Sequence, residues 1–485
     1  MKDLNPERVW SYFAEILEIP RLSKHEEKII AYLEKFALAH QLPFQKDNAG
    51  NCLITKPASA GFENRATVVL QSHLDMVGEK LTETTHDFSK DPISVRIEEG
   101  WMTAEGTTLG ADDGIGIAAS MAILESDEIV HGPLECLFTA DEESGMTGAF
   151  GLKEGFIKGK ILLNLDSEDE GEIFIGCAGG IDTVGKLKKV TRPVQANRVA
   201  LRFTVDGLQG GHSGDEIHKG FANAIKIMNR MLWNMDQRFK VNLVTFRGGK
   251  LRNAIPRDAQ ATIVVKEKHL GHLKSYYNTF MEMITKEIRT VEPGFEMTMK
   301  EVRIPELCYK KGFQRRLMNM IYACPHGVIS WSPIIPGLVE TSTNLAVLND
   351  KDHDFIELVT SQRSSVESAK RDIANRVEAL ITLAGGVTGH SEGYPGWKPN
   401  KDSEILEISE TIYKKLFHTD PEVKAIHAGL ECGLFLQKYP DLDMISFGPT
   451  IKGAHTPDER INIETVAKFW DFLLEILRQV PKNNQ

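Results

Sequence analysis

The sequence lacks the long apolar segments that insert into membranes. We find no run of about 20 apolar residues, the length that spans a bilayer. Charged side chains interrupt residues 1–20, which therefore contain no continuous apolar stretch of the signal-peptide type. We expect a protein without a membrane partner.

Cysteine is scarce and scattered. The 485 residues include six cysteines, and no two of them have the close spacing of a zinc finger or a redox motif. This usage predicts reduced thiols in a cytoplasmic protein.

Positive charge is not in excess. Lys and Arg number 57 against 68 Asp and Glu, which gives a net charge of −11 and argues against a nucleic-acid partner. Hydrophobic residues make up 41% and charged residues 26%, ordinary values for a globular protein, so wholesale disorder is excluded. The length suggests two or more domains.

Short apolar runs alternate with helical patterns in the N-terminal third, as in an α/β domain. These runs are bounded by polar or glycine-rich segments, which is typical of central strands of a largely parallel sheet covered on both faces. They lie at 66–70, 134–138, 161–165 and, much later in the chain, 444–447. Ser23 and Glu26 fit a capping box that would open a helix with Ile29, Leu33 and Phe36 on one side.

The pattern changes in the middle of the chain. Alternating stretches at 199–205 and 261–265 predict antiparallel strands, and helical patterns at 222–233 and 366–383 could cover one face of them. We therefore expect an α+β domain at 186–385, inserted between the two parts of the α/β domain, 1–185 and 386–485. The run at 444–447 requires the chain to return to the first sheet.

Side chains of the kind that bind metals follow each apolar run, at the strand ends where open α/β sheets bind ligands. His73 and Asp75 follow the first run on the same side of the strand, so His73 can bind a metal while Asp75 accepts its other ring N–H. Asp166 follows the third run, and His455 follows the fourth.

Two neighbouring glutamates, Glu142 and Glu143, follow the second run. Adjacent residues point in different directions, so one is suited to binding metal and the other to transferring protons. Between the first two runs, the glycine-flanked turn 110–114 carries Asp112, whose carboxylate can approach a metal. Two histidines and three carboxylates, one of them bridging, would give each of two zinc ions three protein ligands and an open position for water.

Each of these features also has an ordinary explanation. A lone His-x-Asp is most often a structural pair, adjacent glutamates are usually solvated, and Asp-Asp-Gly is often a simple turn. Their coincidence at successive strand ends favours a carboxylate-rich metal site.

Many motifs of this chain, in order, resemble those of a known family. They include QSHLDMV (71–77), GTTLGADDGIG (106–116), DEESGMTGAFGL (141–152), GGHSGDEIH (210–218), LRNAIPR (251–257), HAGLECGLF (427–435) and GPTIKGAHTPDE (448–459). On these motifs the chain is identified as a member of the dinuclear zinc peptidases that include carnosinases, aminoacylases and glutamate carboxypeptidases.

The resemblance implies a role for individual residues. Asp112 would bridge two metal ions, with His73 and Asp166 completing one site and Glu143 and His455 the other. Glu142 would be the general base, and Asp75 would orient His73.

The resemblance also implies that the inserted segment is a lid domain. Its His212 would help stabilise the tetrahedral intermediate, in many relatives from the opposing subunit. Asn253 and Arg363 resemble positions that bind the substrate's carbonyl or terminal carboxylate, although Arg363 could equally make surface contacts on an exposed strand. Glu431 would lie near the free amino end of the substrate.

The activity implied is hydrolysis of Xaa-His dipeptides, including β-alanyl-histidine, with two divalent ions, zinc or alternatively cobalt or manganese. The expected partners are a small dipeptide and a second copy of the chain, bound through the lid. Broader dipeptidase activity, N-acyl amino acid hydrolysis and a non-catalytic zinc- or peptide-binding role remain alternatives. Glu142 argues against the last, because a binder needs no base.

Overall fold

The computed structural model describes residues 1 and 3–483, which form two compact units. The first unit contains Met1–Cys177, Trp397–Ala425 and Leu430–Gln485, and the second contains Ala178–Gly396 and Ile426–Gly429. The inserted domain was expected at 186–385; the second unit extends beyond that range at both ends, to Ala178 and Gly396, and also takes in residues 426–429. Backbone hydrogen bonds hold that short segment, since Ala178 N–H donates to the carbonyls of Ile426 (3.1 Å) and Ala428 (2.9 Å).

An eight-stranded sheet forms the centre of the first unit. Its strands, in spatial order, are β1 (Phe44–Lys46), β2 (Cys52–Lys56), β6 (Leu134–Thr139), β3 (Val68–His73), β7 (Ile161–Asn164), β21 (Asp443–Ser446), β8 (Glu172–Cys177) and β20 (Glu422–Ile426). β6, β3, β7 and β21 run parallel to one another. These four strands correspond to the four apolar runs, and the expected α/β class is confirmed.

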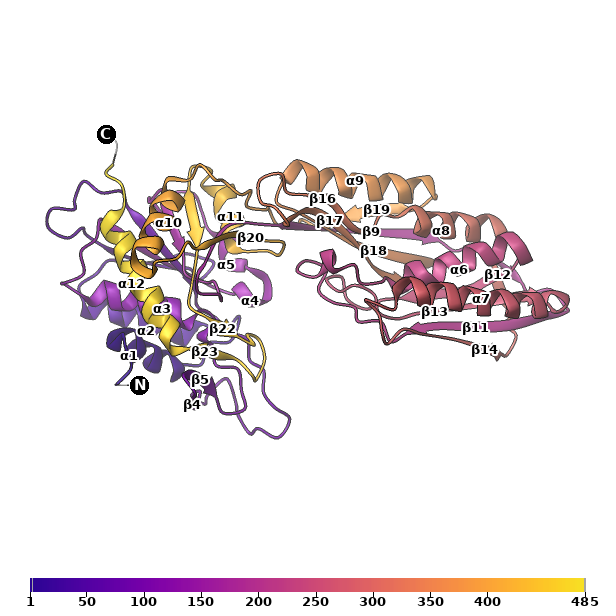
Figure 1. Cartoon of the computed structure of the whole chain (residues 1–485), viewed down its shortest axis with the longest axis horizontal. Coiled ribbons are helices and arrows are strands. Elements are labelled where there is room, and N and C mark those ends of the chain that lie inside the picture. Colours follow the sequence, from indigo (N-terminus) through magenta and orange to yellow (C-terminus); the bar gives the residue numbers. More distant parts are fainter. Residues whose placement is uncertain (2, 484–485) are drawn as a thin grey trace. The chain divides into compact units, whose positions relative to one another are not determined.

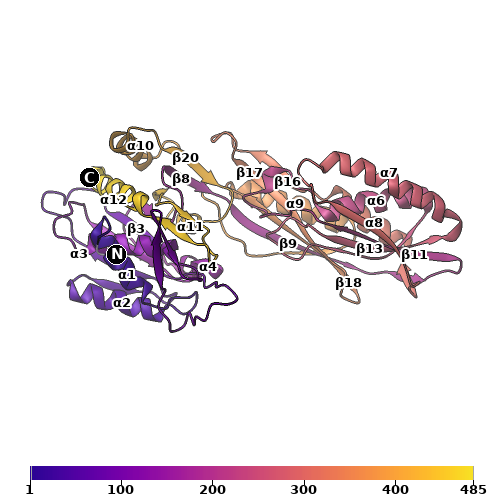
Figure 2. The same cartoon turned by 60° about the horizontal axis from the view of Figure 1, so that its bottom comes forward.

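Helices cover this sheet and build its ligand-bearing turns. α1 packs against α3 and α3 against β3, whereas α10 packs against α12 and β21 (Figures 1 and 2). The helices of this unit are α1 (Glu7–Leu17), α2 (Glu27–Ala39), α3 (Ala111–Glu125), α4 (Glu142–Gly145), α5 (Thr147–Gly151), α10 (Glu404–Phe417), α11 (Glu431–Lys438) and α12 (Ile463–Gln479). A smaller sheet has the order β22 (Ile451–Lys452), β23 (Arg460–Asn462), β5 (Trp101–Ala104) and β4 (Val95–Glu98).

The predicted helix after Ser23 is present as α2, and its expected apolar side is buried. The predicted capping box is wrong. Ser23 Oγ donates instead to Asp75 Oδ2 (2.7 Å), and Glu26 Oε1 accepts from the backbone N–H groups of Lys24 (2.9 Å) and Asp141 (3.0 Å). Both side chains thus connect the start of the helix to the turns that follow β3 and β6.

A nine-stranded antiparallel sheet forms the second unit. Its order is β14 (Glu296–Val302), β11 (Arg198–Asp206), β13 (Ala259–Lys266), β12 (Asn242–Gly248), β17 (Val339–Asn349), β18 (Phe355–Ser364), β9 (Gly179–Lys188) and β19 (Val387–His390), with β16 (Gly327–Trp331) paired to β17. β10 (Thr191–Pro193) and β15 (Leu307–Tyr309) form a separate pair. The strands expected at 199–205 and 261–265 are β11 and β13.

Four helices of the second unit share one hydrophobic core with this sheet (Figures 1 and 2). They are α6 (Ala224–Phe239), α7 (Leu270–Ile288), α8 (Lys311–Ala323) and α9 (Glu367–Leu383), with short 3₁₀ turns at Ile217–Lys219 and Glu267–His269. α6 and α9 were expected, but α7 and α8 were not. α7 buries Leu273, Tyr277, Phe280 and Ile284, and its partly buried Leu270, Tyr276, Met281 and Ile288 pack against the same core.

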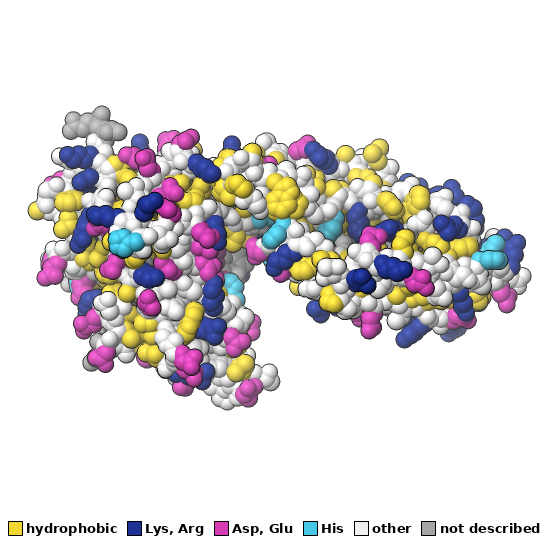
Figure 3. All heavy atoms as spheres, in the orientation of Figure 1, with side chains coloured by type: hydrophobic (Ala, Val, Ile, Leu, Met, Phe, Trp, Pro, Cys, Tyr) yellow, Lys and Arg dark blue, Asp and Glu magenta, His cyan; other side chains and the backbone are white. Residues whose placement is uncertain are grey.

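Among the described residues, no helix combines the length and apolar character needed to cross a membrane. All six cysteines are buried and free, as the sequence predicted. On the face shown in Figure 3, acidic and basic side chains are interspersed on the surface of each unit.

Candidate metal centre

The parallel strands of the first unit deliver the candidate ligands to one edge of its sheet. His73 is the last residue of β3, Glu142 and Glu143 open α4 just after β6, and Asp166 comes two residues after β7. Because parallel strands end at the same edge, these side chains converge. His455 follows β22 and reaches the same group.

Asp112 lies at the centre of the group. Its Oδ1 is 2.9 Å from His73 Nε2, and its Oδ2 is 3.1 Å from His455 Nε2. Asp166 Oδ1 is 3.4 Å from His73 Nε2, and Glu143 Oε2 is 3.0 Å from His455 Nε2. One carboxylate therefore faces two histidines, each of which has a further carboxylate beside it.

These residues meet the requirements of two adjacent cation sites. The potential ligand atoms of His73, Asp112 and Asp166 lie within 4.8 Å of one another, as do those of Asp112, Glu143 and His455. Glu143 Oε1 is buried without a hydrogen-bond partner, as expected for an oxygen that binds a cation. Imidazole and carboxylate donors suit zinc and related divalent ions.

The close approach of these histidines and carboxylates shifts their pKa values. Burial opposes protonation of His73, but Asp166, Asp112 and Asp75 outweigh it and raise the pKa of His73 well above its usual value. Hydrogen bonding to Asp112 and Glu143 raises the pKa of His455 to about 11. Burial is the largest cause that raises the pKa of Asp166, which reaches about 7. The negative charge of Asp112 adds to this increase in the pKa of Asp166. A divalent cation would reduce the repulsion between the two carboxylates.

Asp75 connects His73 to the glutamate turn. Its Oδ1 lies 3.4 Å from His73 Nδ1 and accepts the Glu142 N–H (3.0 Å), while Oδ2 accepts the Glu143 N–H (3.1 Å). Burial opposes ionisation of Asp75, but its bonds to His73, Ser23 and the Glu142 backbone lower its pKa to about 2. One ionised carboxylate thus positions both a candidate ligand and the start of α4.

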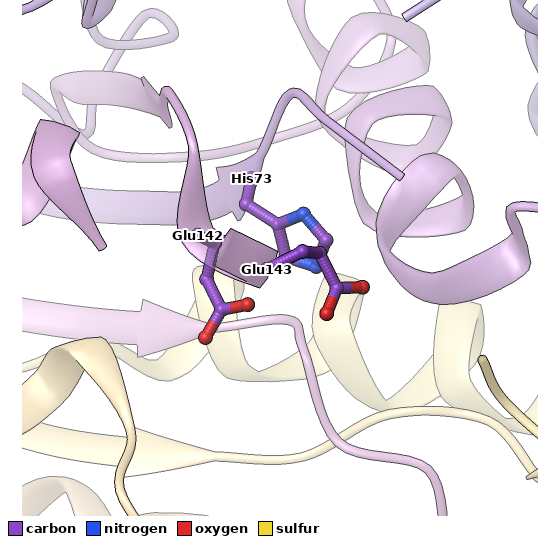
Figure 4. Close-up of side chains that lie close together, drawn as sticks. All are labelled: His73, Glu142 and Glu143. Carbon is purple, nitrogen blue, oxygen red and sulfur yellow. The ribbon is translucent and has the colours of Figure 1, made fainter. Parts of the chain in front are cut away.

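Glu142 and Glu143 point to different sides of α4, as expected for neighbouring residues (Figure 4). An oxygen of each still lies within 4.8 Å of a ring nitrogen of His73. Burial raises the pKa of Glu142 well above its usual value; His73 opposes this shift, and Asp166, Glu431 and Glu143 add to it. A carboxyl group with a raised pKa beside a metal site is suited to accepting and returning a proton.

Glu431 begins α11 and is 2% exposed. Its Oε2 accepts hydrogen bonds from Gln71 Nε2 and Thr139 Oγ1, both at 2.7 Å, whereas Oε1 is buried without a partner. Burial is the main cause that raises the pKa of Glu431 to about 8. The structure therefore holds a buried acceptor oxygen beside the ends of β3 and β6.

His212 and Asn253 belong to the second unit and lie on adjacent segments. His212 forms an isolated β-bridge with Ala254, and the Ser213 N–H donates to the Asn253 carbonyl (2.8 Å). His212 Nδ1 is 3.1 Å from Asp215 Oδ2. The Asn253 side chain is exposed.

Arg363 lies on β18 of the second unit and is only 8% exposed. The alternative of an exposed surface arginine is therefore wrong. Its Nη1 donates to the Tyr394 hydroxyl (2.9 Å), and its Nε is buried without a hydrogen-bond partner. His427 is also buried in this unit, with Nε2 2.7 Å from Ser342 Oγ and Nδ1 unpartnered.

The model of peptidase family M20/M25/M40 matches residues 69–479. The chain belongs to this family. This peptidase is 43% identical over 481 residues to cytosol non-specific dipeptidase of Escherichia coli (strain K12), with 99% of each chain covered. The family resemblance read from the motifs is confirmed.

Solved structures support the fold of this peptidase. The crystal structure of aminoacylhistidine dipeptidase from Vibrio alginolyticus matches with a TM-score of 0.94 and 42% identity, covering 99% of this chain and 98% of that chain. Aminopeptidase PepT from Bacillus cereus shares the fold at 18% identity and a TM-score of 0.56, covering 98% of this chain and 99% of that chain.

Several polar residues near the candidate centre were not assigned from the sequence of this peptidase. Thr139 is the last residue of β6 and Gln71 lies two residues before the end of β3, so both are close to the strand ends where ligands were expected. Glu459 lies inside the motif at 448–459, but no role was assigned to it. In the second unit, His427 lies inside the motif at 427–435 and likewise had no assigned role. No sequence pattern marks Arg21 as a structural residue, because its hydrogen-bond partners are backbone carbonyls 53 to 89 residues away.

Proposed function

We propose that this peptidase is a dipeptidase that uses two divalent cations to hydrolyse Xaa-His dipeptides, including β-alanyl-histidine. Zinc is the proposed metal, with cobalt or manganese as alternatives. One observation carries the proposal: the two oxygens of Asp112 face His73 and His455 separately, at 2.9 Å and 3.1 Å.

We assign one cation to His73, Asp112 and Asp166, and the other to Asp112, Glu143 and His455. Both sets are among the clusters whose ligand atoms lie within 4.8 Å of one another. When bound, the two ions would polarise the scissile carbonyl and lower the pKa of the attacking water. Asp75, whose Oδ1 lies 3.4 Å from His73 Nδ1, is proposed to orient the His73 ring.

Glu142 is the proposed general base. Its carboxylate accepts the proton of the attacking water and then delivers it to the nitrogen of the leaving amine. The pKa of Glu142 is raised by burial, which favours holding the proton between these two transfers. Its backbone N–H donates to Asp75, so its position is tied to that of His73.

Glu431 is proposed to receive the free amino group of the dipeptide. The buried and unpartnered Oε1 supports this role, since an ammonium group would satisfy it. In the second unit, Arg363 and Asn253 are proposed to bind the substrate's carboxylate or carbonyl, and His212 to stabilise the oxyanion. The unpartnered Arg363 Nε supports the first of these assignments.

The names of the two relatives support two different specificities. The Vibrio protein is an aminoacylhistidine dipeptidase, whereas the Escherichia coli protein is a non-specific dipeptidase. We propose Xaa-His dipeptides as preferred substrates and a broader dipeptide range as the second candidate. N-acyl amino acid hydrolysis is a third candidate, disfavoured by the buried Glu431, which suits a free amino group.

The remaining proposals concern the assembly. We propose that residues 1–185 and 386–485 form the catalytic domain and that residues 186–385 form a lid through which two copies dimerise. A cytoplasmic location fits the name of the Escherichia coli relative, cytosol non-specific dipeptidase, and the buried, free cysteines.

A substrate panel tests this function. The purified chain, supplied with zinc, cobalt or manganese, would be incubated with β-alanyl-histidine, alanyl-histidine, alanyl-leucine and N-acetyl-histidine, with a chelated control. We expect metal-dependent release of free histidine from the first two. Equal hydrolysis of alanyl-leucine would replace the histidine preference with the broader specificity, and cleavage of N-acetyl-histidine alone would overturn the dipeptidase proposal.

A further inference from the structure

A buried carboxylate, Glu459, holds the backbone that carries Asp112. Glu459 is 2% exposed. Its Oε2 accepts the N–H groups of Leu109 (2.8 Å) and Gly110 (3.0 Å). Its Oε1 accepts those of Ala111 (2.8 Å) and Asp112 (3.4 Å). Four consecutive backbone donors therefore converge on a single side chain.

The same glutamate belongs to the loop that carries His455. That loop is tightly closed, because the Thr456 N–H donates to the Gly453 carbonyl (3.2 Å) and the Glu459 N–H to the Thr456 carbonyl (3.1 Å). Glu459 lies four positions after His455, so its bonds join the segment of one candidate ligand to the segment of another.

Arg21 holds the opposite side of the Asp112 segment. It is also 2% exposed, and its Nη2 donates to the Gly110 carbonyl. Its Nη1 donates to the carbonyls of Leu74 (2.9 Å) and Asp75, directly after His73. The peptide groups around Gly110 thus lie between a buried guanidinium and a buried carboxylate.

The Asp112 side chain takes no part in these bonds. Its N–H is oriented by Glu459, while its two carboxylate oxygens face His73 and His455. Burial of the charged Glu459 carboxylate would be costly without hydrogen bonds, and its four backbone donors provide that compensation. Fixing the backbone on both sides limits how far the shared carboxylate can move from either histidine.

We propose that Glu459 is a positioning residue that, opposite Arg21, sets the location of the shared carboxylate Asp112 and thereby the affinity of both cation sites. This inference rests on the proposed function, because it assumes that Asp112 binds cations. Glu459 itself is not one of the candidate ligands.

The alternative is that Glu459 only stabilises the fold, and the chain offers a matched control. Glu135 is likewise buried in the first unit, at 5% exposure, and its Oε2 accepts the backbone N–H groups of Lys158 (2.8 Å) and Gly159 (2.9 Å). Its partners carry none of the candidate ligands. Glu459→Gln and Glu135→Gln therefore each remove the negative charge of a buried side chain that accepts backbone N–H groups.

The test compares these two full-length variants with the unmodified chain. Thermal unfolding of the chelated proteins measures the purely structural cost of each substitution. Titration with Co²⁺, followed by visible absorption and by competition with a chelator, measures the number of sites, their geometry and their affinity. We expect both variants to unfold at lower temperature, but only Glu459→Gln to bind Co²⁺ about 10- to 100-fold more weakly, with an altered spectrum.

Co²⁺ affinity and a spectrum in Glu459→Gln equal to those of Glu135→Gln would overturn the inference. If Glu459→Gln does not fold, Glu459→Asp replaces it, because the shorter side chain keeps the charge but withdraws the acceptor; unchanged Co²⁺ binding there would equally overturn it. Failure of the unmodified chain to bind two Co²⁺ ions would instead overturn the proposed function, and this inference with it.

Discussion

His455 Nε2 lies 3.1 Å from Asp112 Oδ2, although the two residues are separated by 343 positions in the sequence. The chain reaches this arrangement by leaving the first sheet after β8 and returning to it in β20 and β21. His455 also has a positive φ of 63°, a conformation that costs a non-glycine residue about 1–3 kcal/mol and is typical of functional sites. The contact is therefore a tertiary feature that the surrounding loop maintains.

The shared position of Asp112 predicts an asymmetry between ligand substitutions. Asp112→Ala removes a ligand from both proposed sites, whereas His455→Ala removes one from a single site. Metal analysis of the purified variants should give less than one ion per chain for Asp112→Ala and about one for His455→Ala. Two tightly bound ions in Asp112→Ala would show that the carboxylate is not shared.

Glu142→Ala should abolish turnover without emptying the metal sites. Loss of a general base typically costs 10²- to 10⁴-fold in rate. The measurement is kcat for alanyl-histidine together with metal content, and Glu128→Ala, at an exposed position, serves as the control. A metal-replete Glu142→Ala protein that retains more than about a tenth of the activity would show that the base is misassigned.

Asp75→Asn should weaken metal binding through His73. The substitution removes the charge that orients the ring and holds the N–H groups of Glu142 and Glu143, so we expect a 10- to 100-fold loss of affinity. Ser23→Ala, which deletes only one hydrogen bond to Asp75, should have a smaller effect. The prediction fails if both variants compete equally well with a chelator for zinc.

The second unit should become less stable as the pH falls from about 6.5 to 4. His326 Nδ1 accepts the Leu345 N–H (3.3 Å), and burial, with a contribution from Lys226, lowers its pKa to about 4. The unfolded chain therefore binds more protons than the folded chain in this range, and folding loses about 1–2 kcal/mol by pH 5.

Thermal unfolding of His326→Gln at pH 7 and at pH 5 measures this effect. The variant should show a smaller loss of stability on acidification than the unmodified chain. His353→Gln, at a side chain that is 98% exposed, should leave the pH dependence unchanged. An identical pH dependence in all three proteins would exclude His326 as the source.

The periodicity of short sequence segments predicted the strands of the first sheet and the ligands that follow them, but not the contacts between distant segments. The four parallel strands were visible as short apolar runs, and His73, Asp166 and the glutamate pair followed them at a predictable edge. Ser23 and Glu26 matched a capping box, yet both bond to turns distant in the sequence because Asp75 and Asp141 lie within reach. Arg21 and Glu459 act on backbone groups, and no residue pattern marks such partners.

In the second unit too, sequence patterns did not predict contacts that depend on tertiary packing. Arg363 was assigned by resemblance, but its burial against Tyr394 depends on how β18 packs. His427 is buried in the second unit although the segments on either side of it belong to the first. Composition and periodicity do not predict that so short a segment belongs to a different unit from its neighbours in sequence.

The most direct test of the account is a stoichiometric titration of the metal-free chain with Zn²⁺, followed by release of histidine from alanyl-histidine. Because Asp112 faces two histidines that each have a second carboxylate, the account predicts that activity rises to its maximum at two equivalents of zinc. Full activity at one equivalent, or hydrolysis that persists with excess chelator, would contradict a centre built on two cations.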